Sequence, residues 1–255
     1  MSTMIAPPRN EAAGRRAGEA RLVVPDVSWR VYETWVDSLP ESTPVRMAYD
    51  GRDLEIMTKG PDHEDYRQLL GHLVVEIARS LKLPLKGLGE TTWKRSEIQR
   101  GIEADQSYYF RPEKLTAAAR SRGANDVASF PNPDLAIEVD LSPSLIDRPG
   151  IYAAMGVAEV WRFDGATLTI ERLGPYGLYE QAAASAFLGV RPDEVARWLV
   201  AEDTTDEIAW LERLSAWLRN DLCLAQERME EAVMNEGPAR RILVLWDRSQ
   251  QFRGL

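Results

Sequence analysis

The sequence is poor in the side chains that bind soft metals or form covalent cross-links. Among its 255 residues there is one cysteine, Cys223, and there are only two histidines, His63 and His72. A single cysteine excludes an intramolecular disulfide framework, and it excludes cysteine-based zinc and iron–sulfur sites. Any bound metal must therefore be held mainly by carboxylates and water, which suits magnesium or manganese better than zinc.

Long apolar runs are also missing. No stretch reaches the roughly 18 residues that cross a membrane. The N-terminal segment contains arginines but no apolar signal-peptide core. We therefore expect a protein of a reducing compartment, located in the cytoplasm, without a membrane partner.

Basic residues are outnumbered. The 31 Lys and Arg against 40 Asp and Glu give a net charge of −9. An acidic chain repels phosphate backbones at long range, which argues against general nucleic-acid coating but leaves a metal-dependent nuclease open. With 44% hydrophobic residues the chain can form a sizeable core in one or two domains.

Hydrophobic periodicity predicts a mixture of helices and strands. The clearest helix begins at Asp62, a good N-cap residue, and ends before Pro84. The small, polar residues 116–132 indicate a loop or linker. We expect helices over 28–38, 62–81, 146–155 and from 187 onward; a hairpin over 47–57; two short strands within 85–110; and strands over 135–141, 157–163, 167–173 and 176–180.

The two ends of the chain differ from its middle in composition. Residues 1–20 indicate a flexible leader, 187–235 a helical extension packed on or near the core, and 236–255 a tail. Trp198, Trp210 and Trp217 in the extension would suit either a self-association face or packing onto the core.

Acidic residues gather on single faces of two predicted strands. Because side chains alternate along a strand, Asp134, Glu138 and Asp140 point to one side, away from the apolar residues between them. Glu103 and Asp105 share a face of an earlier strand in the same way.

Several carboxylates on one half-buried face repel one another, and a divalent cation resolves the conflict. If the two strands are neighbours, Asp105 and Glu138 could hold one ion, a site suited to phosphodiester cleavage. Other roles stay open: Asp134 as a strand-entry residue, Asp140 as a cap of the following turn, and Glu103 as a solvated strand residue.

These residues resemble the Uma-type restriction endonuclease family, a branch of the PD-(D/E)XK nuclease superfamily. The resemblance runs from Ser28 to Arg219. Its motifs are Tyr49-Asp-Gly51, Leu54-Glu-Ile-Met57, His63-Glu64 at the start of a long helix, Gly101-Ile-Glu-Ala-Asp-Gln-Ser-Tyr-Tyr109, Pro133-Asp-Leu-Ala-Ile-Glu-Val139 with Ser142-Pro-Ser144, and Ile151-Tyr152 before Gly156-Val-Ala-Glu-Val-Trp161. From the residues alone, His63 and Glu64 are also explained as incidental members of a first helical turn.

The resemblance implies a mixed α/β (α+β) fold over 21–186. Its restriction-endonuclease-like core, in α-β-β-β-α-β order, has a central mixed sheet flanked by helices, with C-terminal helices beyond. Magnesium would bind at one end of the sheet. Asp105 would match the aspartate of the second core strand, and Glu138 the acid of the third-strand motif.

The third-strand motif of the superfamily places a lysine two residues after its acid. In this sequence Asp140 stands two residues after Glu138, so the lysine is missing from that position. In this family the lysine appears on the following helix, four residues before the tyrosine, and that position is Arg148. Arginine stays charged, so it can orient water or stabilise charge but cannot accept a proton. Lys94 is a second candidate for the basic role. A surface Arg148 paired with Asp147 is the simpler alternative, and Pro149-Gly150 would disturb the helix start.

The leading hypothesis is a magnesium-dependent (or manganese-dependent) DNA endonuclease acting as a homodimer. Asp105, Glu138, Arg148 and Asp134 would be catalytic, and Asp105, Glu138, Glu103 and Asp140 would hold the metal. The alternative is a catalytically impaired relative that serves as a binding or assembly module. Hydrolysis of a smaller phosphoester is a third possibility, since no long basic stripe for a duplex is visible.

Overall fold

Two β-sheets and the helices around them make up the computed structural model, which describes residues 19–40, 43–124 and 127–219. The tail predicted over 236–255, Cys223 and nearly all of the predicted leader lie outside these ranges. Ala20, the last residue of the predicted leader, is the first residue of a strand.

The first sheet has five antiparallel strands in the order β1-β3-β2-β6-β5. Its hairpin confirms the one predicted around Asp50-Gly51, where Asp50 Oδ1 accepts hydrogen bonds from the backbone of Arg52 and Asp53, and Gly51 has a φ of +96°. The strands are β1 (Ala20–Val24), β2 (Val45–Tyr49), β3 (Leu54–Thr58), β5 (Thr92–Arg95) and β6 (Arg100–Glu103).

The second sheet has six strands in the order β11-β10-β9-β8-β7-β4 and is mixed, because β8 and β9 are parallel. Helix α4 (Arg148–Ala154) makes the crossover between them, as parallel strands require. Gly156, with a φ of +67°, follows this helix. The strands are β4 (Lys86–Gly87), β7 (Gln106–Tyr109), β8 (Leu135–Val139), β9 (Glu159–Phe163), β10 (Leu168–Leu173) and β11 (Tyr179–Gln181).

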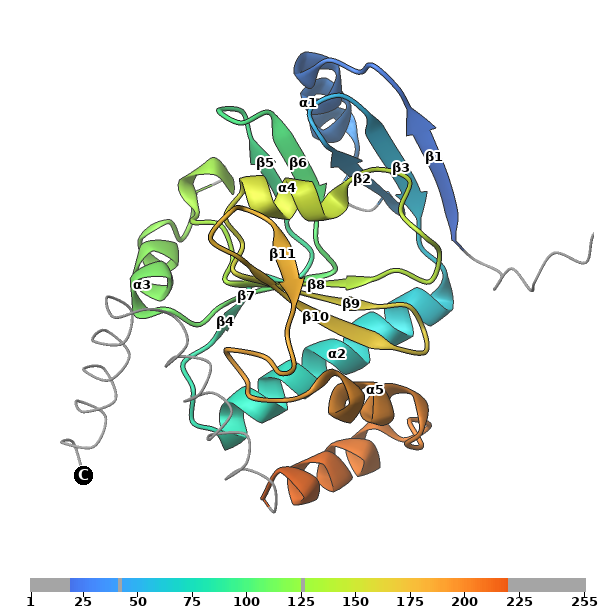
Figure 1. The fold of residues 1–255 in the computed structure, drawn as a ribbon, viewed down its shortest axis with the longest axis vertical. Helices are drawn as coiled ribbons and strands as arrows, with labels where there is room; N and C mark the ends of the chain where they lie inside the picture. Colours follow the sequence, from blue (N-terminus) through green and yellow to red (C-terminus); the bar gives the residue numbers. More distant parts are fainter. Residues whose placement is uncertain (1–18, 41–42, 125–126, 220–255) are drawn as a thin grey trace, which may run out of the picture.

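Helices cover both sides of the six-stranded sheet. Figure 1 shows α2 (Pro61–Ser80) and α5 (Pro192–Val200) below it, and α4 above it, beside the five-stranded sheet. The remaining helices are α1 (Trp29–Ser38), α3 (Pro112–Arg120), a 3-10 turn over Val127–Ser129, and residues 207–219. The predicted mixed α/β class with a central mixed sheet and C-terminal helices is confirmed, and the five-stranded sheet is a second layer beside it.

Three local predictions were wrong. Helix α2 begins at Pro61 after Gly60, so Asp62 is not its N-cap. The stretch expected as a loop holds most of α3, because its alanines favour a helix although they look like linker residues. The two strands expected within 85–110 are four short ones, β4 to β7.

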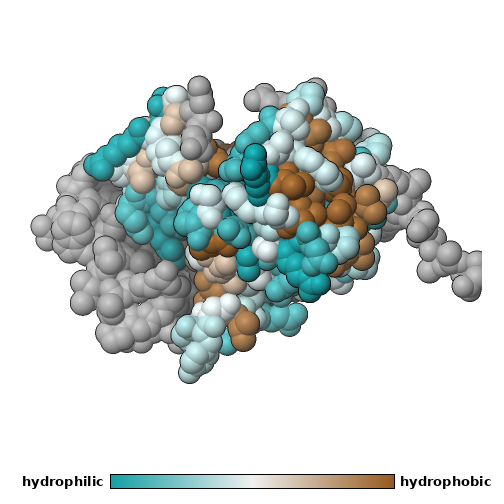
Figure 2. Space-filling view, turned by 90° about the horizontal axis from the view of Figure 1, so that it is seen from above, coloured by the Kyte–Doolittle hydropathy of each residue, from teal (hydrophilic) through white to brown (hydrophobic). Residues whose placement is uncertain are grey.

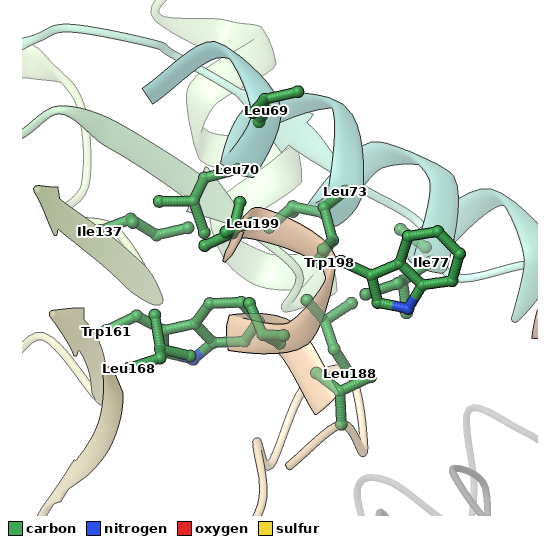
Figure 3. Close-up of a cluster of buried hydrophobic side chains, with 14 of the residues drawn as sticks. Leu69, Leu70, Leu73, Ile77, Ile137, Trp161, Leu168, Leu188, Trp198 and Leu199 are labelled. Atoms are coloured by element: carbon green, nitrogen blue, oxygen red, sulfur yellow. The ribbon is translucent and has the colours of Figure 1, made fainter. Parts of the chain in front are cut away.

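A dry hydrophobic core lies between the six-stranded sheet and the helices below it (Figure 3). Leu73 of α2, Trp161 of β9 and Trp198 of α5 are buried there. Trp210 is also buried, and its ring centroid lies 6.0 Å from that of Trp198. The described part of the C-terminal extension therefore packs onto this core, which confirms the packing role for these two tryptophans.

The end of the molecule that carries α1 and β1 has a mixed surface. Seen from above, hydrophobic side chains gather in one region with hydrophilic ones around them (Figure 2). Leu22, Val31 and Trp35, from β1 and α1, are among the exposed apolar residues. None of the helices described in the structure combines the length and apolar character of a membrane span.

Candidate active site

Charged residues share one face of the five-stranded sheet. Arg21 and Arg46 both pair with Met57 in the strand register, and Glu55 occupies the next position on the same face. All three side chains are buried. The opposite face carries Met47, Leu54 and Ile56 and packs against α1. The charged face turns toward α4 and the ends of β7 and β8, where the predicted acids lie.

Asp105 is completely buried at the start of β7 and is fixed by β8. Its backbone N–H donates to the Ile137 carbonyl (3.1 Å), and its Oδ2 accepts from the Val139 N–H (2.6 Å). Its Oδ1 lies 2.5 Å from Arg46 Nη1 and 3.2 Å from His63 Nε2. Burial opposes ionisation, but Arg46 and His63 outweigh it and hold the pKa of Asp105 well below its usual range.

Glu138 lies between the two β8 residues that hold Asp105, so the two acids are neighbours, and it is only 1% exposed. Its Oε2 accepts from Arg148 Nη2 (2.6 Å), and its Oε1 accepts from the Tyr152 hydroxyl. Burial raises the pKa of Glu138, Arg148 opposes the rise, and the charge of Asp105 adds to it. Burial also raises the pKa of Tyr152, so its hydroxyl keeps the proton that it donates.

Arg148 is buried, so the alternative in which it is a surface residue paired with Asp147 is wrong. Its Nη1 donates to Asp140 Oδ1 (3.0 Å), beside the bond to Glu138. Asp147 instead caps α4 by accepting from the Gly150 N–H, and a Cβ at Gly150 would lie 2.3 Å from the Asp147 Oδ2. Pro149 at the helix start and Gly150 therefore support α4 instead of disturbing it.

Asp140 continues the network toward the five-stranded sheet. Its Oδ1 accepts from Arg21 Nη2 (2.8 Å), and Arg21 Nη1 donates to Glu55 Oε1 (2.9 Å). Glu55 Oε2 also accepts from the Leu145 N–H (2.6 Å), which fixes the loop before α4. Asp140 thus joins two arginines and does not cap the turn that follows it.

Asp134 is not brought together with Asp105 and Glu138. It lies four residues before Glu138, a separation of roughly 13 Å along a strand. Its Oδ2 accepts from the backbone of Phe110 and Arg111 (2.9 Å each), and its Oδ1 lies 3.0 Å from Lys114 Nζ. The structure therefore favours the strand-entry role, in which Asp134 fixes the start of α3, over the predicted catalytic role.

Glu103 and Lys94 lie at the edges of the site. The Glu103 carboxylate accepts from Thr92 Oγ1 (3.2 Å) and lies 3.5 Å from Arg46 Nε, and burial raises its pKa. Lys94, on the edge strand β5, pairs with Asp37 of α1. Lys94 therefore does not take the place of the motif lysine beside Glu138.

The charge partners were not predicted from the sequence. Arg46 and Arg21 are single arginines in short apolar strands, a pattern with no local signature. Tyr152 and Glu55 lie within the motifs that carry the family resemblance, and this was the one indication in the sequence that they belong to the site. His63, explained above as incidental, is fully buried against Asp105.

Metal ligands are few in this arrangement. Within residues 19–40, 43–124 and 127–219, no three His, Cys, Asp or Glu side chains are placed to hold a metal ion. Asp105 Oδ1, however, is a buried oxygen that accepts no hydrogen bond of good geometry there.

Comparison with known proteins indicates a class of nuclease. The Uma2 family, described as "Putative restriction endonuclease", matches residues 29–196. The chain belongs to the Uma2 family. A solved structure described as "a putative nuclease belonging to DUF820" from Anabaena variabilis is similar, with 16% sequence identity, coverage of 68% of this chain and 99% of that one, and a TM-score of 0.44. No curated protein matches.

Proposed function

We propose that the protein is a metal-dependent endonuclease that hydrolyses DNA phosphodiester bonds, with Asp105 and Glu138 as its metal-binding acids. One observation carries this proposal: two fully buried carboxylates lie side by side on neighbouring strands of the mixed sheet, inside a nuclease-type family. Two neighbouring buried carboxylates repel each other even though Arg46 and Arg148 each pair with one of them, and a bound divalent cation would offset that repulsion.

The residues fit magnesium as a two-carboxylate site. Magnesium is commonly held by one or two carboxylates, with water and substrate oxygens completing its shell. Asp105 Oδ1 and the Glu138 carboxylate would serve as ligands, and a cation there would compete with the guanidinium groups of Arg46 and Arg148. Glu103 and Asp140, which contact arginines and threonine, lie outside this pair. A bound magnesium or manganese ion would supply charge that activates water and offsets charge on the phosphate.

The basic residues of the site have roles that follow from their chemistry. Arg148 cannot accept a proton, so it would position Glu138 and donate hydrogen bonds to a substrate oxygen. Tyr152 holds the other Glu138 oxygen and fixes the orientation of that carboxylate. Asp134 stays outside this proposal because it fixes α3. A homodimer and a cytoplasmic location remain predictions from the sequence.

A catalytically impaired binding module is the second candidate, and one observation favours it. A guanidinium already faces each acid, Arg46 at Asp105 (2.5 Å) and Arg148 at Glu138 (2.6 Å). These pairs neutralise the two charges that would attract a cation. In that case Asp105 and Glu138 would be structural anchors.

Nicking of supercoiled plasmid in manganese separates the two candidates. The nuclease proposal expects nicking by the parent, none in EDTA, and a loss of at least about 100-fold in Asp105→Asn, because the charge that holds the metal is gone. Glu171→Gln is the matched control, since Glu171 pairs with Arg162 at another part of the same sheet. Equal nicking by Asp105→Asn and the control would contradict the proposal, and a folded parent that never nicks would favour the binding module.

A further inference from the structure

A second charged cluster lies at the outer side of Asp105, and the function proposed above does not use it. It is built around Glu90, in the loop between β4 and β5. Three cations contact the same carboxylate oxygen, Glu90 Oε1: Arg46 Nη2 at 2.8 Å, Lys59 Nζ at 2.9 Å and Arg67 Nε at 2.9 Å.

The three cations are held in place independently of Glu90. Arg46 also contacts Asp105, and Lys59 and Arg67 contact the two different oxygens of Glu64 at 2.8 Å each. Removing the Glu90 carboxylate would therefore leave three ordered cations aimed at one empty position.

Glu90 is more exposed than the three cations that it contacts. Its side chain is 31% exposed, compared with 3% for Arg46, 13% for Lys59 and 23% for Arg67. It follows Gly89, whose φ of +56° suits glycine and where added side-chain atoms would meet open space. The carboxylate thus comes from an accessible loop, whereas the cations come from a strand, a strand end and a helix.

A backbone phosphate matches what Glu90 supplies. A phosphodiester carries one negative charge on terminal oxygens that accept charged hydrogen bonds from arginine and lysine. Exchanging Glu90 for a phosphate would keep the charge of the cluster unchanged. Arg46 contacts both Glu90 and Asp105, so its guanidinium group would lie between this phosphate and the proposed metal-binding acid.

We propose that Arg46, Lys59 and Arg67 form a binding site for one backbone phosphate of DNA, and that the Glu90 carboxylate occupies this site until DNA displaces it. The inference rests on the proposed function and deepens it, because it assigns contacts to the substrate beyond the scissile bond. Glu90 would thereby weaken binding of DNA to the resting protein.

Fluorescence anisotropy of a labelled DNA duplex, in EDTA so that no cleavage occurs, tests the site. Glu90→Gln should lower the Kd for DNA by about fivefold, since the competing charge is removed. Asp62→Asn is the matched control: it makes the same charge change at an exposed residue of α2 that pairs with none of the three cations in the described structure. Its Kd should change much less.

Arg67→Gln tests whether the tighter DNA binding of Glu90→Gln depends on the three cations. In the Glu90→Gln background it should abolish the fivefold gain, with an unchanged circular dichroism spectrum as evidence of folding. Equal tightening by Glu90→Gln and Asp62→Asn, no tightening by Glu90→Gln, or a gain that survives Arg67→Gln would each overturn the proposal.

The outcome is separable from that of the proposed nuclease activity. Tighter binding by Glu90→Gln in a protein that never nicks DNA would refute nuclease activity and support the phosphate site. Nicking by the parent combined with unchanged binding by Glu90→Gln would refute the phosphate site alone.

Discussion

The two faces of strand β8 are equally buried but are stabilised in different ways. Leu135, Ile137 and Val139 enter the hydrophobic core beneath the sheet. Glu138, between two of them in sequence, enters the charged network above the sheet with Arg148 and Tyr152. One strand thus contributes to the hydrophobic core with one face and to the proposed active site with the other.

The comparison separates two kinds of burial. A large apolar side chain contributes about 1.5–3 kcal/mol when it is fully buried. A buried ion pair contributes little net stability, because desolvation offsets attraction, yet removal of one partner is costly. The hydrophobic face should therefore respond to lost volume, and the charged face to lost partners.

The largest loss of stability is expected in the hydrophobic core. Trp161→Ala removes a fully buried ring that lies among the side chains of α2 and α5 (Figure 3). We expect a loss of about 4 kcal/mol in the free energy of unfolding, measured with urea. A loss below about 1 kcal/mol would mean that the core is not the main source of stability.

A smaller loss is expected on the charged face, and this one should be reversible. Arg148→Met leaves Glu138 buried without its cation and should cost about 3 kcal/mol. Adding Glu138→Gln removes the unpaired charge and should restore most of this loss. A double variant as unstable as the single one would contradict the account of the charged face.

The smallest effect is expected outside both regions, in the turn between β9 and β10. Partial burial opposes ionisation, but hydrogen bonds from Thr167 and Ala166 hold the pKa of Asp164 below its usual value. A lowered pKa adds stability above the ordinary pKa of aspartate, and this gain is lost as the pH falls through the lowered value. Asp164→Ala should therefore cost about 1 kcal/mol at neutral pH.

The pH dependence checks the sign of this effect. The free energies of unfolding of the parent and of Asp164→Ala, measured with urea, should converge as the pH falls through the lowered pKa of Asp164, because Asp164 is then protonated in both folded and unfolded chains. A difference that grows toward low pH would show that the pKa of Asp164 is raised instead.

The sequence predicted what depends on local periodicity. The alternation of apolar and acidic residues in β8 placed Glu138 opposite the core, and the repeat of α2 placed Leu73 within it. Both patterns hold because each element turns one face toward the hydrophobic core, whatever its other neighbours are.

Partners set by the tertiary fold were beyond this reasoning. Asp134 shares the strand parity of Glu138, but only the tertiary fold shows that it binds the backbone just before α3 instead of joining the site. Lys94 forms an ion pair with Asp37, which is distant in sequence. Arg46 contacts Asp105 because β2 lies beside β6, a pairing that the sequence does not indicate.

The predicted domain boundary near residue 187 separates residues that share one hydrophobic core in the structure. The described part of the extension contributes Trp198, Trp210 and Leu214 to the same core cluster as α2. The boundary near residue 187 remains a prediction from the sequence.

The most direct test of the central claim compares two neighbours on β8 in the plasmid-nicking assay. Glu138→Gln should still fold, because Arg148 keeps its pairing with Asp140, and should show no nicking in manganese. Ile137→Ala should melt several degrees lower but still nick plasmid well below its melting temperature. Persistent nicking by Glu138→Gln, or loss of nicking only in Ile137→Ala, would contradict the assignment of the site to the charged face.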